Sequence, residues 1–153
     1  MLAIGTDAPD FTLRSHRGGT IHLADLRGDR RALLVFYPMD DTPGCTAQLC
    51  AIRDNFTALS DYGVTPFGIN SDDAASHAAF AEGQHYLFDL LVDEGLEVAR
   101  RYEAATEGDA RPQRTVYIVG RDGRIIFAQR GAPAPATMIA AVEAADDEPT
   151  ASA

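Results

Sequence analysis

Lysine is absent from this sequence of 153 residues, and all thirteen basic residues are arginine. The 23 acidic residues outnumber them, so the formal net charge is -10. A chain with this acidic balance does not offer the basic surface that nucleic-acid binding requires. We therefore expect no nucleic-acid partner, and we attribute the missing lysine to the host rather than to function.

Long apolar runs and targeting segments are also missing. No stretch approaches the roughly 20 apolar residues that cross a bilayer. The N-terminal segment MLAIGTDAPDFTL has neither the basic start nor the long apolar centre of a signal peptide. We expect a cytoplasmic protein without membrane contact. Its length and its 46% hydrophobic content predict a single domain over residues 1–145, followed by a flexible C-terminal tail over 146–153.

Cysteine is scarce, with only Cys45 and Cys50 in the chain. Two cysteines are too few for a disulfide scaffold, and a reducing cytoplasm disfavours a permanent bridge. Their spacing is not the C-x-x-C of a thioredoxin-type dithiol reductase. The histidines are scattered, without the close spacing of zinc ligands: His16, His22, His77 and His85. We expect no metal site, and we expect each histidine to be exposed or partly buried with an ordinary hydrogen bond.

Alternating β-rich and helical segments predict an α/β fold, with a central mixed sheet covered by helices on both faces. Strands are expected as a hairpin over 11–23, at 31–37, 64–70 and 88–92, and as a second hairpin over 114–131 around an Asp-Gly turn. Helices are expected over 42–61, 72–83, 93–102 and 135–145. The helix over 72–83 has an aspartate start and a glycine stop. The uniformly apolar RALLVFY, 31–37, is typical of a strand buried on both faces.

The two cysteines occur where this buried strand gives way to a helix. With Thr42 as N-cap and Pro43 as the first helical residue, Cys45 lies in the first turn. Unpaired backbone N–H groups and the positive end of the helix dipole favour a thiolate there. Cys45 is therefore a candidate nucleophile. A small buried hydrophobic side chain is the alternative, and position alone does not separate the two roles.

The spacing of the cysteines restricts how they can pair. On an ideal helix, residues five apart have Cα atoms about 8.6 Å from each other, whereas a disulfide needs less than about 7 Å. Cys45 and Cys50 are therefore either two unrelated thiols, or they pair only after the first turns of the helix unwind.

The same segment resembles the active-site motif of peroxiredoxins. Pro38-x3-Thr42-x2-Cys45 matches that motif, and FYP...TPGCTAQLCAIRD is similar to the bacterioferritin comigratory protein, or peroxiredoxin Q, branch. The similarity continues from GTDAPDFTL through SDDAASHAAF to RTVYIVGRDGRII, in the family's order. It implies a thioredoxin-like fold with an N-terminal β-hairpin extension. It also implies reduction of hydroperoxides by a cysteine thiol, without a metal or an organic cofactor.

The resemblance assigns roles to five residues. It makes Cys45 the peroxidatic cysteine, Thr42 the residue whose hydroxyl holds the bound peroxide, and Pro38 a shield of the pocket. Arg114 matches the arginine that lies near the sulfur and the peroxide oxygens. Cys50 falls at the resolving position of those members that carry a second cysteine. Without the resemblance, Thr42 would be read as a plain helix cap and Arg114 as a solvated residue at a strand end.

The implied reaction converts Cys45 to a sulfenic acid, unwinds the helix start, and condenses the sulfenic acid with Cys50 to an intramolecular disulfide. Thioredoxin or a similar dithiol would then reduce this bond. A resolving cysteine in the same chain removes the need for a dimer, so we expect a monomer. Two alternatives are a non-catalytic thiol redox sensor on the same fold and a structural thioredoxin-like domain with inert thiols.

Two features depart from the family pattern. Asp40 and Asp41 stand where relatives often carry a basic residue, and carboxylates near a thiolate oppose its ionisation unless exposure weakens the effect. Glu103 follows Tyr102 where relatives usually have Tyr-Gly, so the loop over 103–113 departs as well.

Overall fold

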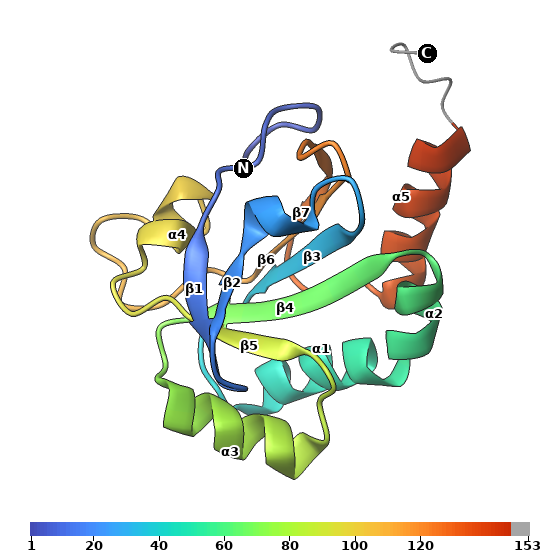
Figure 1. Cartoon of the computed structure of the whole chain (residues 1–153). Helices are drawn as coiled ribbons and strands as arrows, with labels where there is room; N and C mark the ends of the chain where they lie inside the picture. Colours follow the sequence, from blue (N-terminus) through green and yellow to red (C-terminus); the bar gives the residue numbers. More distant parts are fainter. Residues whose placement is uncertain (148–153) are drawn as a thin grey trace.

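A seven-stranded mixed sheet forms the centre of the computed structural model, which describes residues 1–147 (Figure 1). The strand order is β2-β1-β5-β4-β3-β6-β7. The strands are β1 (Thr12–Ser15), β2 (Thr20–His22), β3 (Arg31–Phe36), β4 (Val64–Asn70), β5 (Asp89–Val92), β6 (Thr115–Val119) and β7 (Ile125–Arg130). Strands β3, β4 and β5 are parallel, and the antiparallel β1–β2 and β6–β7 hairpins complete the two edges. Both predicted hairpins are confirmed.

Helices cover both faces of this sheet, as predicted. They are α1 (Pro43–Asp54), α2 (Phe56–Asp61), α3 (Ala74–Gln84), α4 (Glu97–Arg101) and α5 (Pro135–Asp147), with a 3-10 turn at Leu23–Leu26. Helices α1, α2, α3 and α5 pack on one face, whereas α4 and the 3-10 turn pack on the other (Figure 1). Among residues 1–147, no helix is long and apolar enough to cross a membrane.

Strand β3 is the central element of the core and leads directly to the cysteine segment. All six of its residues are buried. Leu33 and Val35 face the α1 side, and Leu34 and Phe36 face the α4 side, because successive side chains of a strand alternate between its faces. The predicted burial on both faces is confirmed, so β3 ends at a fixed point from which α1 begins.

The predicted continuous helix over 42–61 is wrong at one position. It is interrupted at Asn55, whose side-chain Nδ2 donates to the carbonyl of Ala51 at 2.8 Å and ends α1. Hydrophobic spacing did not reveal the break because Ile52 before it and Leu59 after it pack into the same apolar cluster. The consequence is that α1 is a separate helix that carries both cysteines.

Three other helices differ from the expectation at their ends. Helix α4 begins at Glu97, not at residue 93. Helix α3 is capped by Asp73, which accepts from the backbone N of Ser76 at 2.8 Å, and it continues through Gly83. His85, not Gly83, adopts the left-handed conformation that ends the helix, with φ 58°. Helix α5 extends to Asp147 instead of ending at residue 145. The rest of the predicted tail, 148–153, lies outside the described residues.

Candidate active site

Cys45 lies in the first turn of α1, where the sequence placed it. Thr42 is the extended N-cap residue and Pro43 the first helical residue. The Cys45 side chain is 1% exposed and belongs to the apolar cluster between α1 and the sheet. Such burial is equally typical of an inert core thiol, so the role of this sulfur depends on the groups around it.

The hydroxyl of Thr42 does not cap the helix. Its Oγ1 makes no hydrogen bond to the first-turn N–H groups, and its partner is the carbonyl of Met39 at 3.4 Å. The plain-cap alternative for this side chain is therefore wrong. Thr42 keeps a hydroxyl at the helix start beside N–H groups that need acceptors.

Arg114 reaches the same helix turn from just before β6. Its Nη1 donates to Oε1 of Gln48 at 2.8 Å. Its Nη2 lies so close to Gly44 that a Cβ there would be only 3.2 Å away. The alternative of a freely solvated Arg114 is therefore wrong, because Gln48 holds the guanidinium against the residue next to Cys45.

Pro38 is held at the end of β3 by an arginine from the divergent loop. The Nη1 of Arg111 donates to the Pro38 carbonyl at 3.1 Å and to Oδ1 of Asp72 at 3.2 Å. The loop over 103–113 thus contributes to the support of the segment that precedes α1.

Cys50 lies farther along α1 and is half-buried. Its Sγ is 3.5 Å from Oε1 of Gln84 and 3.5 Å from Oη of Tyr86. Both cysteines are free, and the helix between them is continuous. They therefore cannot form a disulfide in this conformation, since ideal helical geometry keeps their Cα atoms about 8.6 Å apart.

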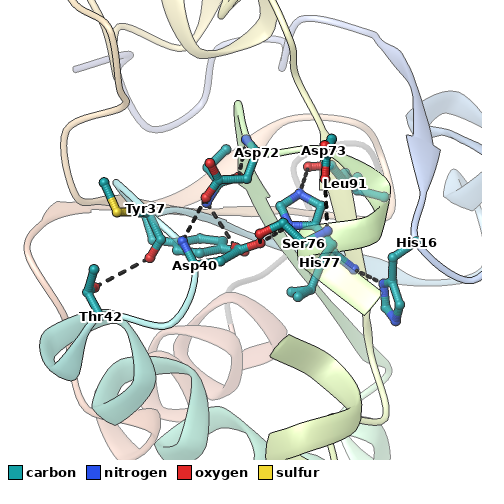
Figure 2. Close-up of polar contacts among 12 residues, drawn as sticks. His16, Tyr37, Asp40, Thr42, Asp72, Asp73, Ser76, His77 and Leu91 are labelled. Carbon is teal, nitrogen blue, oxygen red and sulfur yellow. Dashed lines mark hydrogen bonds and ion pairs between the residues drawn. The ribbon is translucent and has the colours of Figure 1, made fainter. Parts of the chain in front are cut away.

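Asp40 is buried at 7% exposure and forms the centre of a polar network (Figure 2). Its carboxylate accepts from Tyr37 Oη at 2.6 Å, from Ser76 Oγ at 2.8 Å and from Asn70 Nδ2 at 3.1 Å. Burial by itself raises the pKa of Asp40, but hydrogen bonds from His77, Tyr37 and Ser76 outweigh it and hold that pKa below its ordinary value. The sequence suggested that exposure to solvent would weaken the effect of the Asp40 charge on the thiolate. That is wrong, because Asp40 is buried and these hydrogen-bond donors compensate its charge.

His77 connects Asp40 to the sheet and is completely buried. Its Nδ1 lies 2.6 Å from Oδ2 of Asp40, and its Nε2 lies 2.9 Å from the carbonyl of Leu91 in β5 (Figure 2). A carbonyl can only accept, so Nε2 carries a hydrogen. The prediction that every histidine is exposed or partly buried is wrong here. Because the backbone N of Asp40 also donates to Asp72 at 2.8 Å, the loop before α1 is fixed from both α3 and β5.

Known proteins share the sequence pattern and the fold of this chain. The AhpC/TSA family model matches residues 4–128. The chain belongs to the AhpC/TSA family. Curated relatives include chloroplastic peroxiredoxin Q from Triticum aestivum, 39% identical over 124 residues, which cover 80% of this chain and 57% of the relative. Chloroplastic peroxiredoxin Q from Arabidopsis thaliana is 41% identical over 122 residues, which cover 78% and 55%. The chain thus spans a little over half the length of these relatives.

Solved structures agree with the family assignment. Peroxidoxin BcpB from Mycobacterium tuberculosis superposes with a TM-score of 0.86 at 26% identity, covering 94% of this chain and 98% of that chain. A PrxQ mutant from Xylella fastidiosa superposes with a TM-score of 0.82 at 20% identity, covering 95% and 96%, and shows the fold alone. The predicted thioredoxin-like fold and the resemblance to the peroxiredoxin Q branch are confirmed.

In this member of the AhpC/TSA family, Thr42 and Cys45 lie at the start of α1, Arg114 is held against Gly44 and Gln48 of the same helix, and Cys50 lies farther along it. Pro38 precedes the helix, and its carbonyl accepts from Arg111. Gln48 was not predicted from the sequence, although its position three residues after Cys45 puts both side chains on one side of the helix. Beside the site lies a groove of about 300 Å³ lined by Gln48 and by seven small or apolar residues: Gly44, Ala47, Ala51, Ala132, Pro133, Ala134 and Pro135. Among residues 1–147, no three His, Cys, Asp or Glu side chains form a group suited to a metal ion.

Proposed function

We propose that this chain is a thiol peroxidase that reduces hydrogen peroxide and organic hydroperoxides through Cys45. One observation carries the proposal: the Arg114 guanidinium is held by Gln48 against the first turn of α1, which contains Cys45. An inert core thiol has no need of an oriented cation beside its helix turn. Membership of the AhpC/TSA family and the similarity to peroxiredoxin Q support the same activity.

The chemistry requires a thiolate and groups that align the peroxide. The Cys45 sulfur attacks one peroxide oxygen, the S–O bond forms, the O–O bond breaks, and the leaving oxygen takes a proton. The reaction gives a sulfenic acid on Cys45 and releases water or an alcohol. In this proposal, the Thr42 hydroxyl, the Arg114 guanidinium and the first-turn N–H groups bind the peroxide oxygens and stabilise charge on the departing one.

Magnitudes show why these aligning groups matter. For a generic thiol, lowering the pKa from about 8.5 to about 6 raises the thiolate fraction at pH 7 roughly thirtyfold. The accompanying loss of basicity lowers the intrinsic nucleophilicity roughly ten- to eighteenfold. Thiolate formation alone therefore raises the rate of attack on peroxide only a few-fold. Most of the rate must come from orientation and charge stabilisation by Thr42 and Arg114.

The second half of the proposed cycle assigns Cys50 as the resolving cysteine. Cys45 and Cys50 share an intact helix in the reduced form, so the first turns of α1 must unwind before the sulfurs meet. A dithiol of the thioredoxin type would then reduce the disulfide. A cytoplasmic location and a monomeric state stay predictions. The apolar groove beside Gly44 and Gln48 supports the inclusion of organic hydroperoxides, since it could accommodate an alkyl group.

Cys50→Ser tests the resolving role. We expect the variant to consume one equivalent of peroxide at the wild-type rate, because Cys45 and its surroundings are unchanged. It should then lose steady-state turnover with thioredoxin, because no intramolecular disulfide can form. Peroxide consumption measured in single-turnover and steady-state assays checks both parts.

Undiminished steady-state turnover of Cys50→Ser would contradict the resolving role. The same assay separates a peroxidase from a redox sensor on this fold. A sensor would form the disulfide in the wild-type chain once and show no sustained consumption of peroxide with any dithiol reductant.

A further inference from the structure

The Cys50 sulfur has two polar neighbours, the amide oxygen of Gln84 and the hydroxyl of Tyr86. Gln84 Oε1, at 3.5 Å from the Cys50 sulfur, can only accept a hydrogen bond, so it is a partner for the thiol form. Tyr86 Oη, also at 3.5 Å, can donate. In this conformation, the Tyr86 hydroxyl is therefore the one of the two contacting groups that can donate a hydrogen bond to a thiolate at Cys50.

Tyr86 is held by elements other than α1. It is 7% exposed, its ring stacks on Phe88 with centroids 5.0 Å apart, and Phe80 packs edge-on at 5.2 Å. Phe80 belongs to α3, and Tyr86 and Phe88 lie between α3 and β5. The hydroxyl of Tyr86 therefore keeps its place when the first turns of α1 unwind.

The hydroxyl has one hydrogen and two possible acceptors in the reduced form. The second acceptor is the carbonyl of Thr46, at 3.4 Å. In an α-helix this carbonyl also accepts a hydrogen bond from the backbone N–H of Cys50. The helix therefore holds the carbonyl in place, and the Tyr86–Thr46 contact exists only while this turn of α1 is helical. Unwinding the turn that contains Thr46 removes this competing acceptor and leaves the Cys50 sulfur as the partner of Tyr86.

We propose that Tyr86 is a catalytic residue of the resolving step: its hydroxyl donates a hydrogen bond to the Cys50 thiolate and holds that sulfur in place for attack on the Cys45 sulfenic acid. This inference rests on the proposed peroxidase function. In the step, the Cys50 thiolate forms the S–S bond, the S–O bond of the sulfenic acid breaks, and the departing hydroxide takes the proton lost by Cys50 and leaves as water. The Cys50 sulfur is oxidised and the Cys45 sulfur is reduced.

The charges nearby are consistent with this role. Burial, together with the contact to Cys50, raises the pKa of Tyr86, so it stays a hydrogen-bond donor at neutral pH. The charged group next to it on α1 is Arg53, whose Nη1 donates to the Gln84 carbonyl at 2.8 Å and whose Nη2 pairs with Asp54 at 2.9 Å. Arg53 is thus committed to other partners, which leaves the Tyr86 hydroxyl as the donor that contacts the sulfur.

Tyr86→Phe tests the proposal because it removes only the hydroxyl and keeps the stacked ring. The hydrogen bond to a charged sulfur predicts roughly tenfold slower disulfide formation after one equivalent of hydrogen peroxide. The preceding formation of sulfenic acid should keep its wild-type rate. Quenched-flow mass spectrometry distinguishes the reduced, sulfenic and disulfide forms, and the longer-lived sulfenic acid should give more sulfinic acid in excess peroxide.

A second measurement does not depend on peroxidase chemistry. In a Cys45→Ser background, iodoacetamide alkylates Cys50 alone. Loss of the Tyr86 hydroxyl should lower the thiolate fraction of Cys50 about tenfold and raise the nucleophilicity of the remaining thiolate about threefold. Alkylation of Cys50 should therefore be about threefold slower. Tyr62→Phe is the matched control, because the Tyr62 hydroxyl bonds to the exposed Glu143 at 2.6 Å. It should change neither rate.

Disulfide formation in Tyr86→Phe at the wild-type rate would overturn the proposal, whatever the alkylation rate. A wild-type chain whose two thiols both stay free after peroxide would overturn the proposed function and, with it, the step that Tyr86 serves. The two failures are distinguishable, because only the second leaves the wild-type thiols unchanged by peroxide.

Discussion

Cys45→Ser should lose peroxide consumption altogether, by roughly a thousandfold or more, the scale on which removal of a nucleophile affects enzymes. Serine has nearly the same size, so the buried position in the first turn of α1 stays filled. A hydroxyl cannot be oxidised to a sulfenic acid, and it is a far weaker nucleophile than a thiolate. A peroxide-electrode or stopped-flow assay with excess dithiol reductant measures the loss.

Two controls separate chemistry from damage to the fold. Cys50→Ser should keep the reaction with the first equivalent of peroxide, and the melting temperature of Cys45→Ser should stay near that of the wild type. Peroxide consumption by Cys45→Ser above the rate of protein-free buffer would show that another group reacts, and it would contradict the assignment of Cys45.

His77→Ala should destabilise the protein by about 3 to 5 kcal/mol, because it removes a partner of the buried Asp40 carboxylate and leaves that charge poorly compensated. The Asp40 carboxylate would stay buried at 7% exposure without its contact to Nδ1 of His77. The carbonyl of Leu91 would lose its donor as well. Urea unfolding at neutral pH measures the change in the free energy of unfolding.

His22→Ala is the matched control, since it removes a histidine paired with an aspartate at the surface. His22 Nε2 and Asp10 Oδ2 are 2.7 Å apart, but the two side chains are 42% and 46% exposed. Exposed pairs contribute little to stability because solvent screens them, so His22→Ala should have a much smaller effect than His77→Ala. Equal losses in the two variants would contradict the interpretation of the Asp40–His77 pair as a buried anchor of the loop before α1.

The depressed pKa of Asp40 gives this anchor a pH dependence. A carboxyl group with a lower pKa in the folded state contributes stability that is complete above its ordinary value of 3.8 and is lost as the pH falls through the folded-state value. The difference in unfolding free energy between the wild type and Asp40→Asn should therefore narrow on acidification from pH 7 to pH 3. A difference that widens would contradict the assigned pKa direction.

The sequence predicted those elements whose cause is local. The buried strand β3 follows from an unbroken apolar run, and the β6–β7 hairpin follows from an Asp-Gly pair whose Gly123 has φ 82°. The start of α1 follows from Thr42 and Pro43, which set the backbone at the first turn. In each case the decisive residues are neighbours in the chain.

The missed features depend on contacts between distant segments. Asp40 lies in the loop between β3 and α1, whereas His77 lies in α3. The packing of α3 against β5 helps to bring His77 Nδ1 within 2.6 Å of Asp40 Oδ2. Arg114 meets Gln48 because β6 pairs with β3, which leads into α1. No periodicity or capping rule describes such pairs. For the same reason, the sequence showed where Cys50 lies but not that Tyr86 touches it.

The most direct test of the account is an intact mass and a free-thiol count of the fully reduced protein after one equivalent of hydrogen peroxide at neutral pH. We expect loss of two hydrogens and of both thiols, at the mass of a monomer, because Cys45 and Cys50 form a disulfide once α1 unwinds. A gain of oxygen without a bridge would contradict the resolving role of Cys50. Unchanged mass and thiols after minutes would contradict the peroxidase function itself.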